Sequence, residues 1–137
     1  MDNAFGLFGV YELAPLVSFV LTMGIYILLI NAYNLIDGID KLAGGILAIN
    51  FGVFAMLFLI LGQFGYVLLS VVAFGAVKGF LKFNSHPAKI FMGDSGSLPL
   101  GMVMALLTFK VIQLIQEPTV SASTAHWMLP TIIALNF

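Results

Sequence analysis

Three polar side chains at a regular spacing follow a long apolar run in the first third of the chain. Asn34, Asp37 and Asp40 lie in the stretch NAYNLIDGIDKLAGG, residues 31–45. Residues three apart fall on one side of a helix, so this stretch would present an amide and two carboxylates on one face. Carboxylates near membrane depth are costly and usually face a cavity, an ion or a partner. The same residues also fit a solvated helix end.

A second polar stretch, FNSHPAKIFMGDSGSLPLG at residues 83–101, contains a further acid, Asp94. Gly93 to Ser97 stand where the next helix is expected to begin, and the free N–H groups of a helix N-terminus favour an anion such as phosphate. An aspartate would repel that anion unless a divalent cation lay between them. Mg²⁺ is typically held by one or two carboxylates plus substrate phosphate oxygens. Asp94 also fits a plain helix cap.

Phe91 and Asn84 add an aromatic face and an amide to this second stretch. The pair suits a planar polar ring such as a nucleobase, although Phe91 taken alone fits a packing role. His86 precedes Pro87 and fits a turn residue better than a metal ligand, because no second histidine is near. A shared site is favoured because both polar stretches are expected on one face of a chain that has few charges.

The composition indicates the class of protein that must position these residues. Hydrophobic residues make up 61% of the 137 residues and charged residues 8%, and the mean hydropathy is +1.13. A soluble globular domain carries about 25% charged residues. The net charge of −1 and the absence of arginine argue against a nucleic-acid partner, and the absence of cysteine excludes disulfides and thiolate metal sites. We therefore expect an all-α polytopic transmembrane helical bundle in a lipid bilayer.

Four full spans and one partial span are expected within a single partial membrane domain over residues 1–137. The last apolar stretch has about 11 residues, too few to cross a hydrocarbon core of about 30 Å. The chain therefore reads as a fragment of a larger multi-span protein. The expected spans cover about 13–30, 46–62, 65–81 and 98–116, with an incomplete one at 127–137.

The short connection GQFG at residues 62–65 predicts an antiparallel hairpin between the second and third spans. That hairpin would place the loops 31–45 and 82–97 on one side of the membrane. The positive-inside rule makes this side cytoplasmic, because most of the lysines lie on or next to it. These lysines are Lys41, Lys78, Lys82 and Lys89. Small residues predict close helix packing at Gly24, Gly52, Gly75, Gly79 and Gly101.

The two polar stretches closely resemble signature loops of the polyprenyl-phosphate N-acetylhexosamine-1-phosphate transferases. The resemblance implies an enzyme of the bacterial inner membrane that uses Mg²⁺, or Mn²⁺, to transfer an N-acetylhexosamine-1-phosphate from a UDP-N-acetylhexosamine to polyprenyl (undecaprenyl) phosphate. This reaction would begin cell-envelope glycan synthesis. NLIDGID with HPAKIFMGDSGS resembles the GlcNAc-1-phosphate branch, which implies lipopolysaccharide biosynthesis. The alternative is the phospho-MurNAc-pentapeptide transferase branch.

The resemblance also implies roles for single residues. The family's catalytic positions correspond to Asn34, Asp37 and Asp94, and its Mg²⁺ ligand corresponds to Asp94. The implied partners are the UDP-sugar, the polyprenyl phosphate and the bilayer, and a homodimer is left open. The implied nucleotide-binding residues are Gly38, Asp40, Asn84 and Phe91.

Lys41 departs from the family pattern, which usually has glycine at this position. A lysine could reach a diphosphate or crowd the pocket, so a non-catalytic paralogue stays open as a reading. A membrane transporter fragment is a further alternative, because intramembrane acids also mark ion paths. The family's upstream Asp-Asp pair and downstream histidine-rich loop are not in this chain, so we expect the fragment alone to be inactive.

Overall fold

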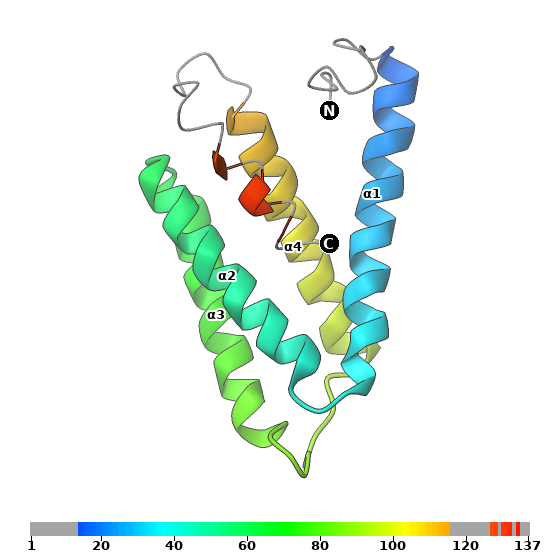
Figure 1. The fold of residues 1–137 in the computed structure, drawn as a ribbon, viewed down its shortest axis with the longest axis vertical. Helices are drawn as coiled ribbons and strands as arrows, with labels where there is room; N and C mark the ends of the chain where they lie inside the picture. The colour runs from blue at the N-terminus through cyan, green and yellow to red at the C-terminus, as the bar shows by residue number, and fades with distance from the viewer. Residues whose placement is uncertain (1–13, 116–126, 129, 133, 135–137) are drawn as a thin grey trace.

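The structure is a computed structural model that describes residues 14–115, 127–128, 130–132 and 134. Figure 1 shows four long helices running lengthwise through the described part of the chain. A short 3-10 helix, η2 (Ile36–Gly38), follows the first of them. The four long helices are α1 (Pro15–Leu35), α2 (Leu42–Ile60), α3 (Phe64–Phe83) and α4 (Asp94–Ile115).

Each of the four long helices is apolar and long enough to cross a membrane. Their mean hydropathies lie between 1.8 and 2.2, and the shortest, α2, has 19 residues. At about 1.5 Å per residue, such a helix extends over about 30 Å, the thickness of a hydrocarbon core. The prediction of a helical membrane bundle is therefore confirmed. The incomplete span expected at 127–137 lies largely outside the described residues.

A tight turn joins α2 to α3. Gly62 has a φ of +68°, its N–H donates to the Leu59 carbonyl at 3.1 Å, and the Gln63 N–H donates to the Phe58 carbonyl at 2.9 Å. These two bonds close the end of α2 as a Schellman motif, whose left-handed position glycine occupies without steric cost. Because α3 begins at Phe64, the chain reverses at once and returns to the end where α2 began.

The centre of the core lies on α2. Leu47, Phe51, Phe54 and Phe58 are fully buried, and the Phe58 ring stacks on Tyr66 of α3. The main packing pairs are α2 with α3 and α1 with α4. Apolar side chains on the outer faces of α1 and α3 are exposed. Such faces suit hydrocarbon, because their side chains are apolar and the backbone polar groups are hydrogen-bonded within the helix.

A glycine lets α4 approach α1 closely one turn before Asn34. A Cβ atom at Gly101 would lie 3.1 Å from Ile30 Cα and 3.4 Å from Tyr33 Cβ. The packing prediction made for Gly101 is confirmed. It stays a prediction for three other glycines, where a Cβ would meet nothing within 4 Å of the described structure, namely Gly24, Gly75 and Gly79.

Candidate active site

The two polar stretches lie at the same end of the bundle, because the α2–α3 hairpin returns the chain to the end where α1 finished (Figure 1). Asn34 stands on the last turn of α1, and Asp37 lies in η2. On the other side, Gly93 has a φ of +61° and leads directly into Asp94, the first residue of α4. Side chains from segments about 60 residues apart therefore meet.

The first set of contacts joins the end of α1 to the start of α4. The Asn34 amide donates to Asp94 Oδ1 at 2.7 Å and to Ser97 Oγ at 2.9 Å. The Gly93 N–H donates to Asp37 Oδ2 at 2.7 Å, so Asp37 binds the residue next to Asp94. Ser97 is fully buried and donates to the Gly93 carbonyl at 3.0 Å. We call Asn34, Asp37, Gly93, Asp94 and Ser97 the acidic cluster.

Asp94 takes its hydrogen bond from α1 rather than from its own helix. The N–H groups of Gly96 and Ser97 donate to the Gly93 carbonyl, at 3.0 and 2.9 Å. Within the described part of the chain, no N–H of α4 donates to the Asp94 carboxylate, which favours a site role over the plain cap. Asp94 is exposed and Asp37 is half-buried, so both carboxylates can be reached from solvent.

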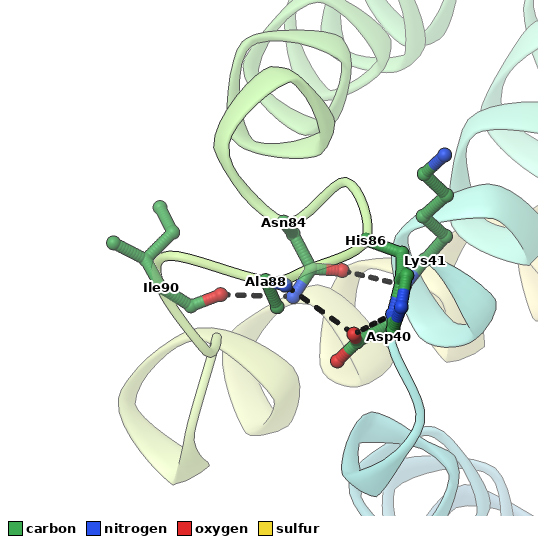
Figure 2. Close-up of polar contacts among 6 residues, drawn as sticks. All are labelled: Asp40, Lys41, Asn84, His86, Ala88 and Ile90. Carbon is green, nitrogen blue, oxygen red and sulfur yellow. Dashed lines mark hydrogen bonds and ion pairs between the residues drawn. The ribbon is translucent and has the colours of Figure 1, made fainter.

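A second set of contacts joins Asp40 to the turn that follows α3 (Figure 2). Asp40 Oδ2 accepts a hydrogen bond from the Ala88 N–H at 3.3 Å and lies 3.0 Å from His86 Nδ1. His86 itself is exposed. The expectation that His86 is a turn residue agrees with this position, and its contact with Asp40 ties the turn to the segment after η2.

Asn84 connects the same two segments from inside. Its side chain is 3% exposed, its Oδ1 accepts the Lys41 backbone N–H at 2.7 Å, and its Nδ2 donates to the Ile90 carbonyl at 2.9 Å (Figure 2). One amide therefore holds both the start of α2 and the end of the turn. We call the whole set the loop clasp: Asp40, Lys41, Asn84, His86, Ala88 and Ile90.

Asn34, Asp37 and Asp40 do not share one helical face, so that prediction is wrong. The α-helix ends at Leu35, η2 tightens the chain through Gly38, and Ile39 is extended with φ −118° and ψ 127°. The change of helix type, followed by an extended residue, turns Asp40 away from the other two. The three residues therefore divide between the acidic cluster and the loop clasp.

Lys41 has a φ of 65° and is the one non-glycine residue with positive φ in the described ranges. This left-handed conformation costs an L-residue about 1–2 kcal/mol, whereas glycine adopts it readily. A glycine, the residue usual at this position in the family that the two loops resemble, would adopt this positive φ without strain. The Lys41 side chain points away from Asp40 and Asn84 (Figure 2), so only its backbone takes part in the loop clasp.

The remaining two residues expected to bind nucleotide are open to solvent. A Cβ atom at Gly38 would meet nothing within 4 Å of the described structure, and Phe91 is 64% exposed. The Phe91 ring borders a cavity of about 290 Å³ between α3 and α4. Apolar side chains predominate in its lining, which comprises Ala76, Val77, Phe80, Phe91, Met92, Ser95, Gly96 and Leu100.

The donor set of the acidic cluster fits a divalent cation that shares its coordination with a substrate. In the described ranges, no group of three or more His, Cys, Asp or Glu side chains could enclose a metal. Mg²⁺ does not need such a group, because it keeps several waters and is usually bound by one or two carboxylates plus phosphate oxygens. Asp37 and Asp94 are the two carboxylates of the acidic cluster that would serve as such ligands.

Sequence reasoning missed two contributors to this end of the bundle. Ser97 was not singled out, although a serine three residues after Asp94 on a helix faces the same side. The second is a buried hydrogen bond of 2.6 Å from the Asn50 amide to the Tyr33 hydroxyl. An amide inside an apolar span was the signal that could have found it.

Known proteins with similar sequences include phospho-N-acetylmuramoyl-pentapeptide-transferases. That of Anoxybacillus flavithermus is 51% identical over 88 residues, which is 62% of this chain and 27% of the relative, and that of Bacillus subtilis gives the same figures. That of Geobacillus thermodenitrificans is 53% identical over 75 residues, 55% of this chain and 23% of the relative. The chain spans about a quarter of the length of these curated relatives. No solved structure matches it significantly.

These names favour the branch that the sequence analysis held as the alternative, and they do not support the GlcNAc-1-phosphate branch. The model of glycosyl transferase family 4 matches residues 1–112, a range that includes the whole acidic cluster and the whole loop clasp. The match covers more than half of the 137 residues. The chain therefore belongs to glycosyl transferase family 4.

Proposed function

We propose that the protein transfers a phosphorylated N-acetylhexosamine from a UDP-linked donor to a polyprenyl phosphate in the membrane. The contact between Asp37 and the residue beside Asp94, which joins the two polar loops, is the observation that carries this proposal. The names of the relatives favour phospho-N-acetylmuramoyl-pentapeptide as the transferred group over GlcNAc-1-phosphate. The lysines near the polar loops support a site on the cytoplasmic face of a multi-pass protein.

In this proposal the acidic cluster receives the diphosphate of the donor. Asp37 and Asp94 would hold Mg²⁺, or Mn²⁺, which when bound would neutralise charge on the diphosphate and on the leaving UMP. Asn34 donates to Asp94 Oδ1 and so orients the carboxylate that would bind the cation. The N-terminus of α4 adds a positive dipole end beside the phosphates.

The reaction is a phosphoryl transfer. An oxygen of the polyprenyl phosphate attacks the sugar-linked β-phosphorus, and a new P–O bond forms while the bond to UMP breaks and UMP leaves with the electron pair. Such a reaction needs mainly positioning and charge neutralisation from the protein. The apolar prenyl chain stays in the bilayer beside the apolar outer faces of the helices, while its phosphate reaches the polar end of the bundle.

The nucleoside half of the donor is proposed to lie over the region of Gly38, Asp40, Asn84 and Phe91. The exposed Phe91 ring offers a stacking face to a nucleobase. The absence of a side chain at Gly38 leaves open space next to that glycine for the ribose or the base. Stacking on an aromatic ring is worth about 1–3 kcal/mol per base.

The test is UMP release from membranes that contain the protein carrying this chain. Polyprenyl phosphate and Mg²⁺ are supplied with either UDP-N-acetylmuramoyl-pentapeptide or UDP-GlcNAc. We expect UMP with the pentapeptide donor and loss of the signal with EDTA or Asp94→Ala. Release from UDP-GlcNAc alone would keep the reaction type and overturn the choice of donor. No release from either donor, or full activity in Asp94→Ala, would overturn the proposed function.

A further inference from the structure

The buried amide of Asn84 is engaged by the protein itself at both ends. Its oxygen accepts the Lys41 N–H at 2.7 Å, and its nitrogen donates to the Ile90 carbonyl at 2.9 Å. At 3% exposure the side chain presents almost no surface to a ligand. A residue whose task is to read a nucleobase must expose polar atoms to it, so this geometry suits another task.

Asp40 makes a parallel set of contacts on the same turn. Its Oδ2 atom accepts the Ala88 N–H and lies 3.0 Å from His86 Nδ1 (Figure 2). Asp40 and Asn84 therefore link the segment before α2 to the turn after α3 at three points, and a fourth bond, from Asn84 to Ile90, closes the turn on itself. The turn continues through Ile90, held by Asn84, directly into the exposed Phe91.

We propose that Asn84, assisted by Asp40, is a positioning residue that locks the turn at 84–90 onto residues 40–41 before any ligand arrives. The lock fixes Phe91 on one side and the backbone of Lys41 and η2 on the other. This inference rests on the proposed function, because it assigns the locked surface to the nucleotide half of the donor. Asn84 acts on the nucleotide through Phe91 and through the backbone near Gly38, without touching it.

The left-handed conformation of Lys41 provides a way to separate positioning from contact. A non-glycine residue stays at a φ of 65° only when its surroundings hold it there, and Asn84 supplies the acceptor that does so. Without that acceptor, Lys41 is expected to relax toward a right-handed conformation and to shift the segment before α2. A glycine at 41 keeps the left-handed conformation without help.

The experiment measures two properties of the purified protein carrying this chain. The first is hydrogen exchange at the Lys41 amide without ligand, and the second is the dissociation constant of UMP. In Asn84→Ala we expect Lys41 exchange to rise about tenfold and UMP binding to weaken about tenfold, the effect of losing one buried hydrogen bond. In the double variant with Lys41→Gly we expect at least about a threefold recovery of UMP affinity. Ser85→Ala is the matched control, because within the described residues the Ser85 hydroxyl bonds only to the carbonyl of Leu81 on the last turn of α3, at 2.9 Å.

Each outcome separates this inference from the proposed function. Unchanged Lys41 exchange in Asn84→Ala, or an affinity loss that Lys41→Gly does not relieve, would overturn the positioning role while UMP binding by the parent still supports the proposed function. A parent that shows no UMP binding, together with faster Lys41 exchange in Asn84→Ala, would overturn the nucleotide assignment and leave the lock intact. An equal loss of UMP affinity in Ser85→Ala would also overturn the role of Asn84.

Discussion

The acidic cluster and the loop clasp lie at the same end of the bundle but are built in opposite ways. In the acidic cluster the carboxylates of Asp37 and Asp94 are open to solvent, and each is fixed through one oxygen. In the loop clasp the central group, Asn84, is buried and both ends of its amide are occupied. Both regions join the same two loops, and the loop clasp also contains a half-buried carboxylate, Asp40, but its Oδ2 atom is occupied by the turn itself.

The difference indicates a division of labour between chemistry and scaffolding. Exposed carboxylates held in place by neighbours are suited to a cation and an anionic substrate, because orientation is supplied in advance. A buried and satisfied amide stabilises the backbone and has little left to offer a ligand. Residues with similar chemistry and nearby sequence positions, such as Asp37 and Asp40, can therefore serve different purposes.

The largest expected effect comes from removing charge in the acidic cluster. Asp94→Asn keeps an oxygen that can accept the Asn34 hydrogen bond, so the fold should be retained while the charge at the proposed cation site is lost. We expect UMP release to fall about 10²–10³-fold with little change in thermal unfolding. Ser95→Ala, at the neighbouring exposed position, is the control. Near-normal turnover in Asp94→Asn would remove the basis for calling the two regions different.

Asp37→Asn should have the next largest effect. Its amide oxygen can still accept the Gly93 N–H, and Asp94 remains to hold the cation. We expect a loss of about 10–100-fold in UMP release, smaller than at Asp94 because one carboxylate of the proposed cation site is kept. A loss as large as that of Asp94→Asn would show that the two carboxylates contribute equally, which would sharpen the description of the acidic cluster.

Gly101→Val should damage the acidic cluster from a distance and spare the loop clasp. A side chain at Gly101 would press on the Ile30 backbone, so α4 and its Asp94 must move away from α1 and Asn34. We expect a loss of about 1–3 kcal/mol in stability, seen as a lower unfolding temperature, together with reduced UMP release. Gly75→Val is the control, since a Cβ there meets nothing within 4 Å of the part of the chain that the structure describes. Equal effects at both glycines would contradict the proposed role of close packing.

Lys41→Gly is expected to have the smallest effect. It removes the strain of a left-handed lysine but makes the unfolded chain more flexible, so the net gain in stability is at most about 1 kcal/mol. Thermal unfolding measures this gain, and UMP release should stay the same or rise. If Lys41→Gly turned an inactive parent into an active enzyme, the reading of a non-catalytic paralogue would gain support.

Patterns along the chain predicted the coarse architecture, because apolar runs and one short turn determine it. The connection at 62–65 was enough to predict the hairpin, and the hairpin was enough to bring Asp37 and Asp94 to one end. The spacing of Asn34, Asp37 and Asp40 was misleading because a period of three fits a continuing helix as well as one that stops. The change to a 3-10 turn at Ile36 and the left-handed Lys41 depend on tertiary contacts that no local pattern reveals.

Details of the site depended on backbone groups that residue types do not reveal. Asn84 and Asp40 suggested ligands by their chemistry, but their partners are the N–H groups of Lys41 and Ala88 and the Ile90 carbonyl. The two polar loops also did not identify the branch of the family that the relatives favour. They resemble the GlcNAc-1-phosphate branch, whereas the names of the relatives favour phospho-N-acetylmuramoyl-pentapeptide as the transferred group.

The most direct test of the central claim, that Asp37 and Asp94 form a cation site shared with a diphosphate, is Mn²⁺ binding followed by electron paramagnetic resonance. The purified protein carrying this chain is titrated with Mn²⁺ at saturating UDP, beside Asp94→Asn and the control Ser85→Ala. The account predicts that Asp94→Asn weakens Mn²⁺ binding at least about tenfold, whereas Ser85→Ala binds like the parent. Equal Mn²⁺ affinity in the parent and Asp94→Asn would contradict it.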